Sequence, residues 1–107
     1  MILNQSTYCD SDELAHLIGG YSAEGWRIMD IFASEHSPEF IMNFLLRRGG
    51  DILRVTSNVE NSYPSITPVV PSASLFERKL WEMNGIIPEG HGDLLPVIYW
   101  RNGNGFP

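Results

Sequence analysis

The chain has 107 residues, a net charge of −6 and a single cysteine, and these totals exclude several classes of protein. The length suits one domain, so we expect residues 1–107 to form a single domain. Nucleic acids and anionic membrane surfaces bind patches of lysine and arginine, so the acidic charge argues against both as partners. One thiol cannot form an internal disulfide or hold an iron–sulfur cluster, and a reducing compartment such as the cytosol is expected. No apolar run approaches about 18 residues, so any membrane association should be indirect, through other proteins.

The first expected element is a short helix over residues 11–18. Asp10 suits the N-cap, and Glu13 stands three residues later in the capping-box position. Apolar residues one helical turn apart then form a stripe: Leu14, Leu17 and Ile18. Gly19-Gly20 is expected to end this helix.

Three strands are expected next, over residues 26–33, 39–46 and 51–57. The middle strand is apolar on both faces, with Phe40, Met42, Phe44 and Leu46 on one and Ile41 and Leu45 on the other. This pattern is typical of a central strand that is covered on both sides. Gly49-Gly50 suits a tight hairpin, so the three strands should form an antiparallel meander. In the first strand, Asp30 is expected on the same side as Trp26, Ile28 and Phe32.

A proline-rich connector and a second helix follow. Pro64, Pro68 and Pro71 exclude a regular helix or a central strand, and interleaved apolar residues predict an extended, pinned connector. A helix is expected over residues 74–84, with Ser74 and Glu77 as a capping box and Gly85 as its end. Its core stripe should be Phe76, Leu80 and Met83, and its other flank Glu77, Arg78, Trp81 and Glu82.

These elements predict an α+β fold of two layers, in which an antiparallel three- to four-stranded sheet packs with two main helices. Beyond the second helix, the tail is rich in glycine and offers apolar anchors only over residues 94–100.

No catalytic motif is present in the sequence. His16, His36 and His91 lack the spacing of paired metal ligands. Cys9 with a distant histidine could form a nucleophile pair, and Asp30, within an apolar strand, could act as an acid or base. An alternative function is therefore a small stand-alone enzyme or adaptor that uses Asp30, His91 or Cys9.

The segment over residues 65–94 carries a family motif. Pro64 precedes it directly, Ser-Ile-Thr begins it at residue 65, and an aromatic residue followed by Glu-Arg comes from residue 76. The matching positions that continue in register are Glu82-Met83, Gly85-Ile86, Glu89-Gly90-His91 and Asp93-Leu94. This segment resembles the C subunit of NADH:quinone oxidoreductase (complex I) and the equivalent domain of membrane-bound nickel–iron hydrogenases and formate hydrogenlyase.

The resemblance implies a non-catalytic interaction subunit in the cytoplasm or on the cytoplasmic face of the membrane. Such a subunit has no cofactor or metal of its own and docks on the large catalytic subunit of a hydrogenase or quinone oxidoreductase. An exposed docking surface also favours a homodimer of the isolated chain. The motif implies these interface or family residues: Phe76, Glu77, Arg78, Trp81, Glu82, Gly85, Glu89, Gly90, His91 and Asp93.

The role of the flank of the second helix stays open. The flank of the second helix could form an interface, or it could form internal hydrogen bonds to the proline-rich connector. His91, between two glycines, is expected to fix a loop by hydrogen bonding. The chain also departs from the family pattern at Lys79, Asn84, Gly92 and Leu95-Pro96. The last departure removes a pair of arginines, which favours a hydrogenase-like or divergent relative over the respiratory enzyme.

Overall fold

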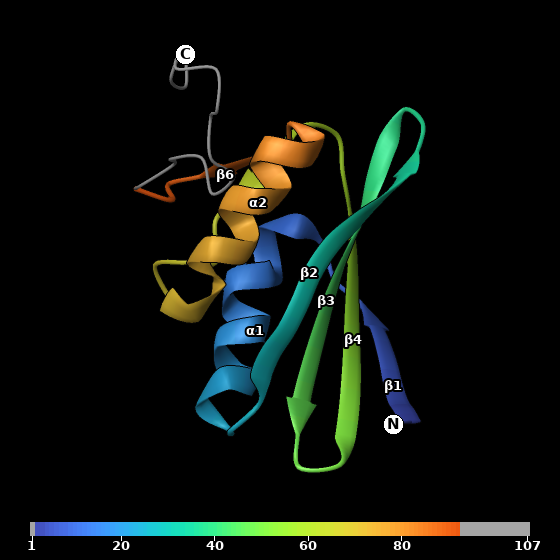
Figure 1. Cartoon of the computed structure of the whole chain (residues 1–107), viewed down its shortest axis with the longest axis vertical. Coiled ribbons are helices and arrows are strands. Elements are labelled where there is room, and N and C mark those ends of the chain that lie inside the picture. Colours follow the sequence, from blue (N-terminus) through green and yellow to red (C-terminus); the bar gives the residue numbers. More distant parts are fainter. Residues whose placement is uncertain (1, 93–107) are drawn as a thin grey trace, which may run out of the picture.

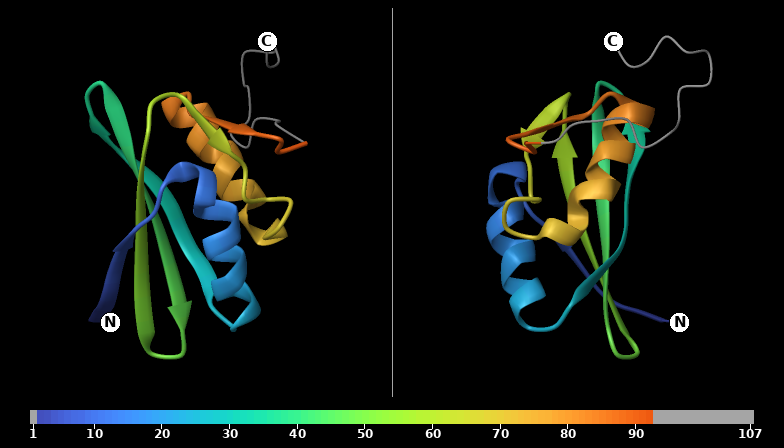
Figure 2. Two further views of the ribbon diagram at one scale, coloured as in Figure 1. Left: turned by 180° about the vertical axis from the view of Figure 1, so that it is seen from behind. Right: turned by 60° about the vertical axis from the view of Figure 1, so that its left-hand side comes forward.

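The computed structural model describes residues 2–92, with side chains from residue 5 onward. The main sheet has the strand order β1-β4-β3-β2, with β1 at Ile2–Tyr8, β2 at Arg27–His36, β3 at Glu39–Arg48 and β4 at Asp51–Val59. Two helices, α1 (Leu14–Ala23) and α2 (Ser74–Asn84), lie on one face of this sheet (Figures 1 and 2). The predicted two-layer α+β fold is therefore confirmed.

The meander of β2, β3 and β4 is antiparallel, as predicted, and each strand extends two or three residues beyond its predicted end. Gly49, with φ +62°, forms the expected tight turn between β3 and β4. The fourth strand, β1, was not predicted and pairs parallel with β4. The sheet is consequently mixed and not wholly antiparallel.

A β-bulge in β2 corrects the predicted facing of its residues. Ile28 pairs with Leu46 and Asp30 pairs with Leu45, so Met29 is the extra residue. Beyond this bulge Ile31 turns to the helices and is 2% exposed, whereas Phe32 lies on the other face and is 37% exposed. Asp30 and Phe32 do share a face, but Trp26 and Ile28 point to the opposite one, into the core.

Helix α1 begins and ends later than predicted. A 3-10 turn at Ser11–Glu13 precedes it, and the Asp10 side chain makes no capping hydrogen bond. The helix continues through Gly19-Gly20, because the left-handed conformation that ends many helices is not adopted there. The predicted apolar stripe is confirmed, since Leu14 and Ile18 are fully buried and Leu17 packs against the core.

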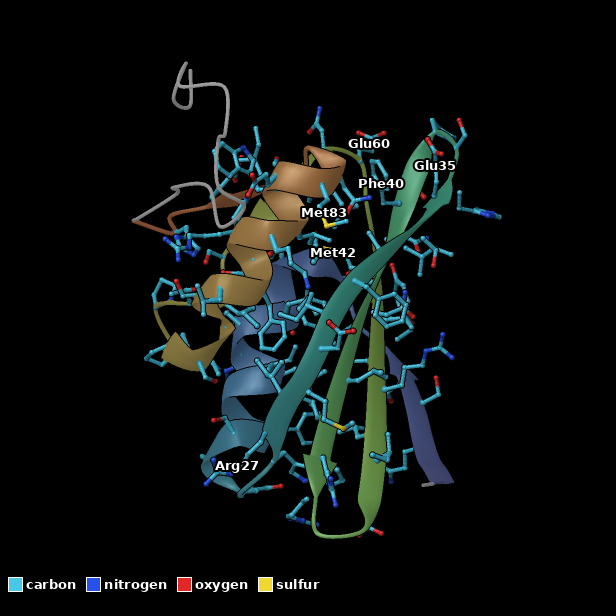
Figure 3. All side chains as sticks on the ribbon, in the orientation of Figure 1. Arg27, Glu35, Phe40, Met42, Glu60 and Met83 are labelled. Atoms are coloured by element: carbon cyan, nitrogen blue, oxygen red, sulfur yellow. The ribbon has the colours of Figure 1, made fainter. Side chains whose placement is uncertain are left out.

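Helix α2 has the predicted bounds, and Gly85 ends it with φ +75°. Leu80 is buried and Phe76 packs against the core, as predicted, but Met83 is 66% exposed and is not a core residue. Met83 lies at the end of the molecule that also carries Glu35 and Glu60, and Arg27 lies at the opposite end (Figure 3).

The face of the sheet that points away from α1 and α2 is covered by no helix of residues 2–92 (Figure 2). On β3, Met42, Phe44 and Leu46 are buried toward the helices, while Ile41 and Leu45 are half-buried on this second face. We call it the uncovered sheet face. It is defined by Asp30, Phe32, Ile41, Asn43, Leu45 and Arg54, with Arg27 and Arg47 at one end.

Two short strands, β5 (Ser62–Pro64) and β6 (Ile87–Glu89), form a separate parallel pair beside α2. A 3-10 turn at Pro71–Ala73 leads directly into α2. The connector is pinned, as predicted, because Tyr63, Ile66 and Val70 are buried.

Candidate functional site

The most distinctive polar site of the described chain is the carboxylate of Glu77, which is fully buried on α2. Each of its oxygens accepts two hydrogen bonds. Oε2 accepts from the Tyr63 hydroxyl at 2.5 Å and from the Ile66 amide at 3.0 Å. Oε1 accepts from the Ser65 hydroxyl at 2.6 Å and from the Thr67 hydroxyl at 2.5 Å. We call these five residues the Glu77 clamp, because they join α2 to the connector.

The sequence of the connector explains why three hydroxyls converge on one carboxylate. Residues 63, 65 and 67 alternate, so in an extended chain their side chains point to the same side. The backbone of this segment is held in place by β6, where the Glu89 carbonyl accepts a hydrogen bond from the Ser65 amide at 2.8 Å. Ser65 also accepts a hydrogen bond from the Thr67 amide at 3.1 Å, which tightens the turn.

The electrostatics of the clamp keep its phenol protonated. Burial raises the pKa of Tyr63, and the negative charge of Glu77 together with their hydrogen bond raises this pKa further. Tyr63 therefore acts as a hydrogen-bond donor at any physiological pH. Glu77 is 0% exposed, and its carboxylate contacts the donors of the connector.

The position of Glu77 answers the open question for this residue of the helix flank and corrects the predicted capping box. Its side chain forms internal hydrogen bonds to the connector and is not part of an exposed flank. The predicted capping box is absent, because the N-cap is Ala73 and no side chain caps the helix. Ser74 instead has its hydroxyl 3.3 Å from Nε2 of His91.

His91 fixes the loop after β6 to the start of α2. Its ring is 7% exposed, and Nε2 lies 3.2 Å from the Ser74 carbonyl oxygen, to which it donates when it carries the proton. Its amide donates to the Pro88 carbonyl at 3.2 Å. Gly90 and Gly92 flank it with φ of +83° and +88°, a conformation that other residues rarely adopt.

The remaining motif residues are divided between α2 and the segment after it. Arg78, Trp81 and Glu82 are half-buried on α2, and Glu89 is exposed on β6. A stripe of exposed residues points outward from α2 at a spacing of four residues. It is formed by Leu75, Lys79 and Met83, and Leu75 is 57% exposed. Asp93 and the apolar tail over residues 94–100 lie outside the described residues.

The residues of the alternative, enzymatic interpretation are not brought together. Asp30 lies on the uncovered sheet face, where its Oδ1 accepts a hydrogen bond from the Ile31 amide, while His91 contacts α2 on the other side. Burial, and then the charges of Glu13 and Asp10, raise the pKa of Cys9 and disfavour its reactive thiolate. Over residues 2–92, no group of three His, Cys, Asp or Glu side chains could hold a metal ion.

None of the helices that the structure describes has the length and apolar character needed to cross a lipid bilayer. His16 is exposed on α1, and His36 is the last residue of β2.

Sequence reasoning missed the donors of the clamp: Tyr63, Ser65, Ile66 and Thr67. A signal for them was present, because hydroxyl residues alternate over residues 63–67 just upstream of a helix with a glutamate one turn from its start. Glutamate in such a position usually indicates a capping box, so the connector hydroxyls were not considered as its hydrogen-bond donors.

The chain matches the family described as the respiratory-chain NADH dehydrogenase 30-kDa subunit over residues 8–107. It is 37% identical over 87 residues to the NADH-quinone oxidoreductase C subunit of Parvibaculum lavamentivorans, covering 75% of this chain and 44% of that protein. It is 42% identical over 55 residues to the corresponding protein of Ruegeria pomeroyi, covering 51% of this chain and 28% of that one. The matches thus span less than half the length of these relatives. This chain belongs to the family of the 30-kDa subunit of respiratory-chain NADH dehydrogenase.

Proposed function

We propose that this chain is a non-catalytic subunit, or a segment of one, in a complex of the NADH-quinone oxidoreductase type. In this proposal it docks through α2 and the following loop on the large catalytic subunit, in the cytoplasm or on the cytoplasmic face of the membrane. The family membership supports the class of complex. The relatives are named as NADH-quinone oxidoreductase subunits, and the hydrogenase-like branch stays a prediction.

The Glu77 clamp is the observation that carries the docking proposal. It uses the glutamate of the family motif to hold the connector against α2, without exposing any reactive atom. A helix fixed in this way keeps its outward side in one orientation. Such preorganisation lowers the entropic cost of association, which suits a surface for a protein partner.

The surface itself is the outward side of α2. Leu75 and Met83 are large apolar side chains that are more than half exposed, and Lys79 lies between them. Half-buried Arg78 lies one turn after Leu75, and half-buried Trp81 lies one turn after Arg78, further around the helix. Tryptophan and arginine are enriched among the residues that dominate binding energy. Exposed apolar side chains in one stripe are typical of an interaction site.

Co-purification from the native host tests the proposal. The tagged chain should bring down a large oxidoreductase subunit, identified by mass spectrometry. Trp81→Ala and Met83→Asp should each reduce the recovered large subunit about tenfold or more, as expected for residues central to an interface. Ser22→Asp, an exposed position on α1, is the matched control and should leave recovery unchanged.

A second measurement addresses the enzymatic alternative. The purified chain should contain no flavin and no stoichiometric metal, and it should show no turnover. The docking proposal fails if the wild-type chain repeatedly brings down no large oxidoreductase subunit. Zinc at one ion per chain, with activity lost in Asp30→Asn or His91→Ala, would favour a small enzyme.

A further inference from the structure

The uncovered sheet face carries a concentration of positive charge that the acidic composition does not suggest. The chain has a net charge of −6, yet Arg27, Arg47 and Arg54 all lie on this face. Asp30 lies two pairs further along β2 and β3, and Glu39 lies on the same face at the far end of β3. Glu35 and Glu60 lie at the opposite end of the molecule from Arg27 (Figure 3).

Two of these arginines stand directly opposite each other. Arg27 on β2 pairs with Arg47 on β3, and like charges in such cross-strand positions repel. Arg47 donates through Nε to the Gly49 carbonyl at 2.9 Å, and this acceptor carries no negative charge. Both side chains are exposed. An anionic group placed between them would turn this repulsion into attraction.

Apolar surface adjoins the arginine pair. A shallow groove of about 500 Å³ opens at the end of β2 and β3 that carries Arg27 and Arg47, and Met29, 36% exposed, is part of its lining. Ile28 and Arg48 also line it but belong to the helix-covered side, so the groove lies at the end of the sheet and adjoins the uncovered sheet face. Further along the same face are half-buried Leu45 and Ile41, with Phe32 37% exposed. Between them, Asn43 accepts a hydrogen bond from Nε of Arg54 at 3.0 Å and is almost fully buried.

We infer that the uncovered sheet face is a second docking surface, for an acidic segment of a neighbouring protein subunit that places carboxylates at Arg27 and Arg47 and an apolar side chain beside Leu45 and Phe32. This inference rests on the proposed function for the existence of the complex. It differs from that proposal in the surface used and in the chemistry of the partner. A purely apolar partner would leave the two arginines unpaired, and a basic one would be repelled.

The test removes the charges of Arg27 and Arg47 and keeps polar side chains at both positions. The tagged double variant Arg27→Gln/Arg47→Gln is compared with Arg27→Lys/Arg47→Lys, which retains both charges. Capture of the oxidoreductase subunits from the host is measured at 50 and 500 mM NaCl. We expect the glutamine pair to capture at least tenfold less than wild type at low salt and to lose most of its salt dependence. The lysine pair should stay within about threefold of wild type, since point charges retain long-range attraction.

A photo-crosslinking residue in place of Phe32 identifies the occupant. It should crosslink to a peptide of another subunit that contains Asp or Glu residues. A crosslink to a second copy of this chain, or equal capture by the glutamine pair and the wild type at both salt concentrations, would overturn the inference.

The two proposals fail in different ways. If the wild-type chain captures no oxidoreductase subunit, the proposed function falls, and this inference falls with it. If capture depends on Trp81 and Met83 but not on the two arginines, only the second docking surface is refuted. The melting temperature of the isolated glutamine pair should equal or exceed that of the wild type, because repulsion is removed, and this excludes misfolding as the cause of lost capture.

Discussion

Glu77 shows how one carboxylate can define the position of a whole segment. Its four donors come from four different residues within a five-residue stretch of the connector. Hydrogen bonds to a charged group stabilise more than neutral ones do, and a buried donor that loses its acceptor is costly. The position of the connector relative to α2 therefore depends strongly on this side chain.

Replacing Glu77 by glutamine should destabilise the fold markedly. The amide group turns one acceptor oxygen into a donor, so the hydroxyls of Ser65 and Thr67, or the donors on the other side, lose their partner. We expect a loss of about 3 kcal/mol in the free energy of unfolding, measured by urea denaturation. Glu60→Gln, at an exposed position, should change it by less than about 0.5 kcal/mol. Equal midpoints for the two variants would contradict the role given to the clamp.

Tyr63 gives the fold a dependence on alkaline pH. Its pKa is raised above the value of about 10 that it has in an unfolded chain. The stabilisation is complete below pH 10 and decreases above it, because the unfolded chain then releases a proton that the folded chain retains. The slope from this residue is about −1.4 kcal/mol per pH unit.

The comparison with Tyr63→Phe isolates this effect. Urea unfolding of both proteins at pH 9, 10 and 11 should show wild-type stability falling more steeply above pH 10, since phenylalanine has no proton to release. Parallel curves would show that Tyr63 titrates normally in the folded chain.

At the scale of elements, α1 contains a natural pair of test sites. Gly19 and Gly20 are neighbours within the helix, but they face different surroundings. A Cβ at Gly20 would meet no atom within 4 Å, whereas a Cβ at Gly19 would come within 2.6 Å of Cγ1 of Val69. The glycine at position 19 therefore permits close approach of the connector to α1, and that at position 20 does not serve packing.

Alanine at the two sites should have opposite effects. Gly20→Ala should raise the free energy of unfolding by about 0.5–1 kcal/mol through better helix propensity. Gly19→Ala should lower it, because Val69 must move. Adding Val69→Ala should restore the gain at position 19, and a double-mutant cycle measures this coupling. If the changes in the free energy of unfolding were additive, Val69 would move aside without an energetic cost.

The elements that sequence patterns predicted share a local origin. The end of α2 at Gly85 and the meander follow from glycine turns and apolar periodicity within short windows. Three features depend on partners distant in sequence: β1, the β5–β6 pair and the bulge at Met29. The residues near these features in sequence do not predict them, because tertiary contacts determine whether they form.

The sequence predicted only some residues of the candidate site. The motif located Glu77 and His91, and hydrogen bonding to the connector was one of two options for the flank of α2. Trp81, Arg78 and Glu82 keep the status of predicted interface residues. The facing of Met83 was wrong, because the buried side of α2 is centred on Glu77 and Leu80, and Met83 lies away from it and is 66% exposed.

At the scale of the whole molecule, the arrangement has two distinct sides. Both helices lie on one face of the sheet (Figure 2). The other face presents arginines and half-buried apolar residues. The prediction that β3 would be covered on both faces thus holds for only one of them within the described chain. A covering protein on the second face would account for the apolar character that β3 has on both sides.

The parallel pairing of β1 with β4 has a consequence for biosynthesis. Ile2 pairs with Asp51, so β1 leaves the ribosome well before β4 and lacks this partner until some fifty further residues have been made. Hairpins close quickly because their ends are near in sequence, so β2, β3 and β4 can associate as they emerge. Strand β1 is then the last to join the sheet, and a nascent chain stalled before residue 51 exposes an unpaired strand to chaperones and aggregation.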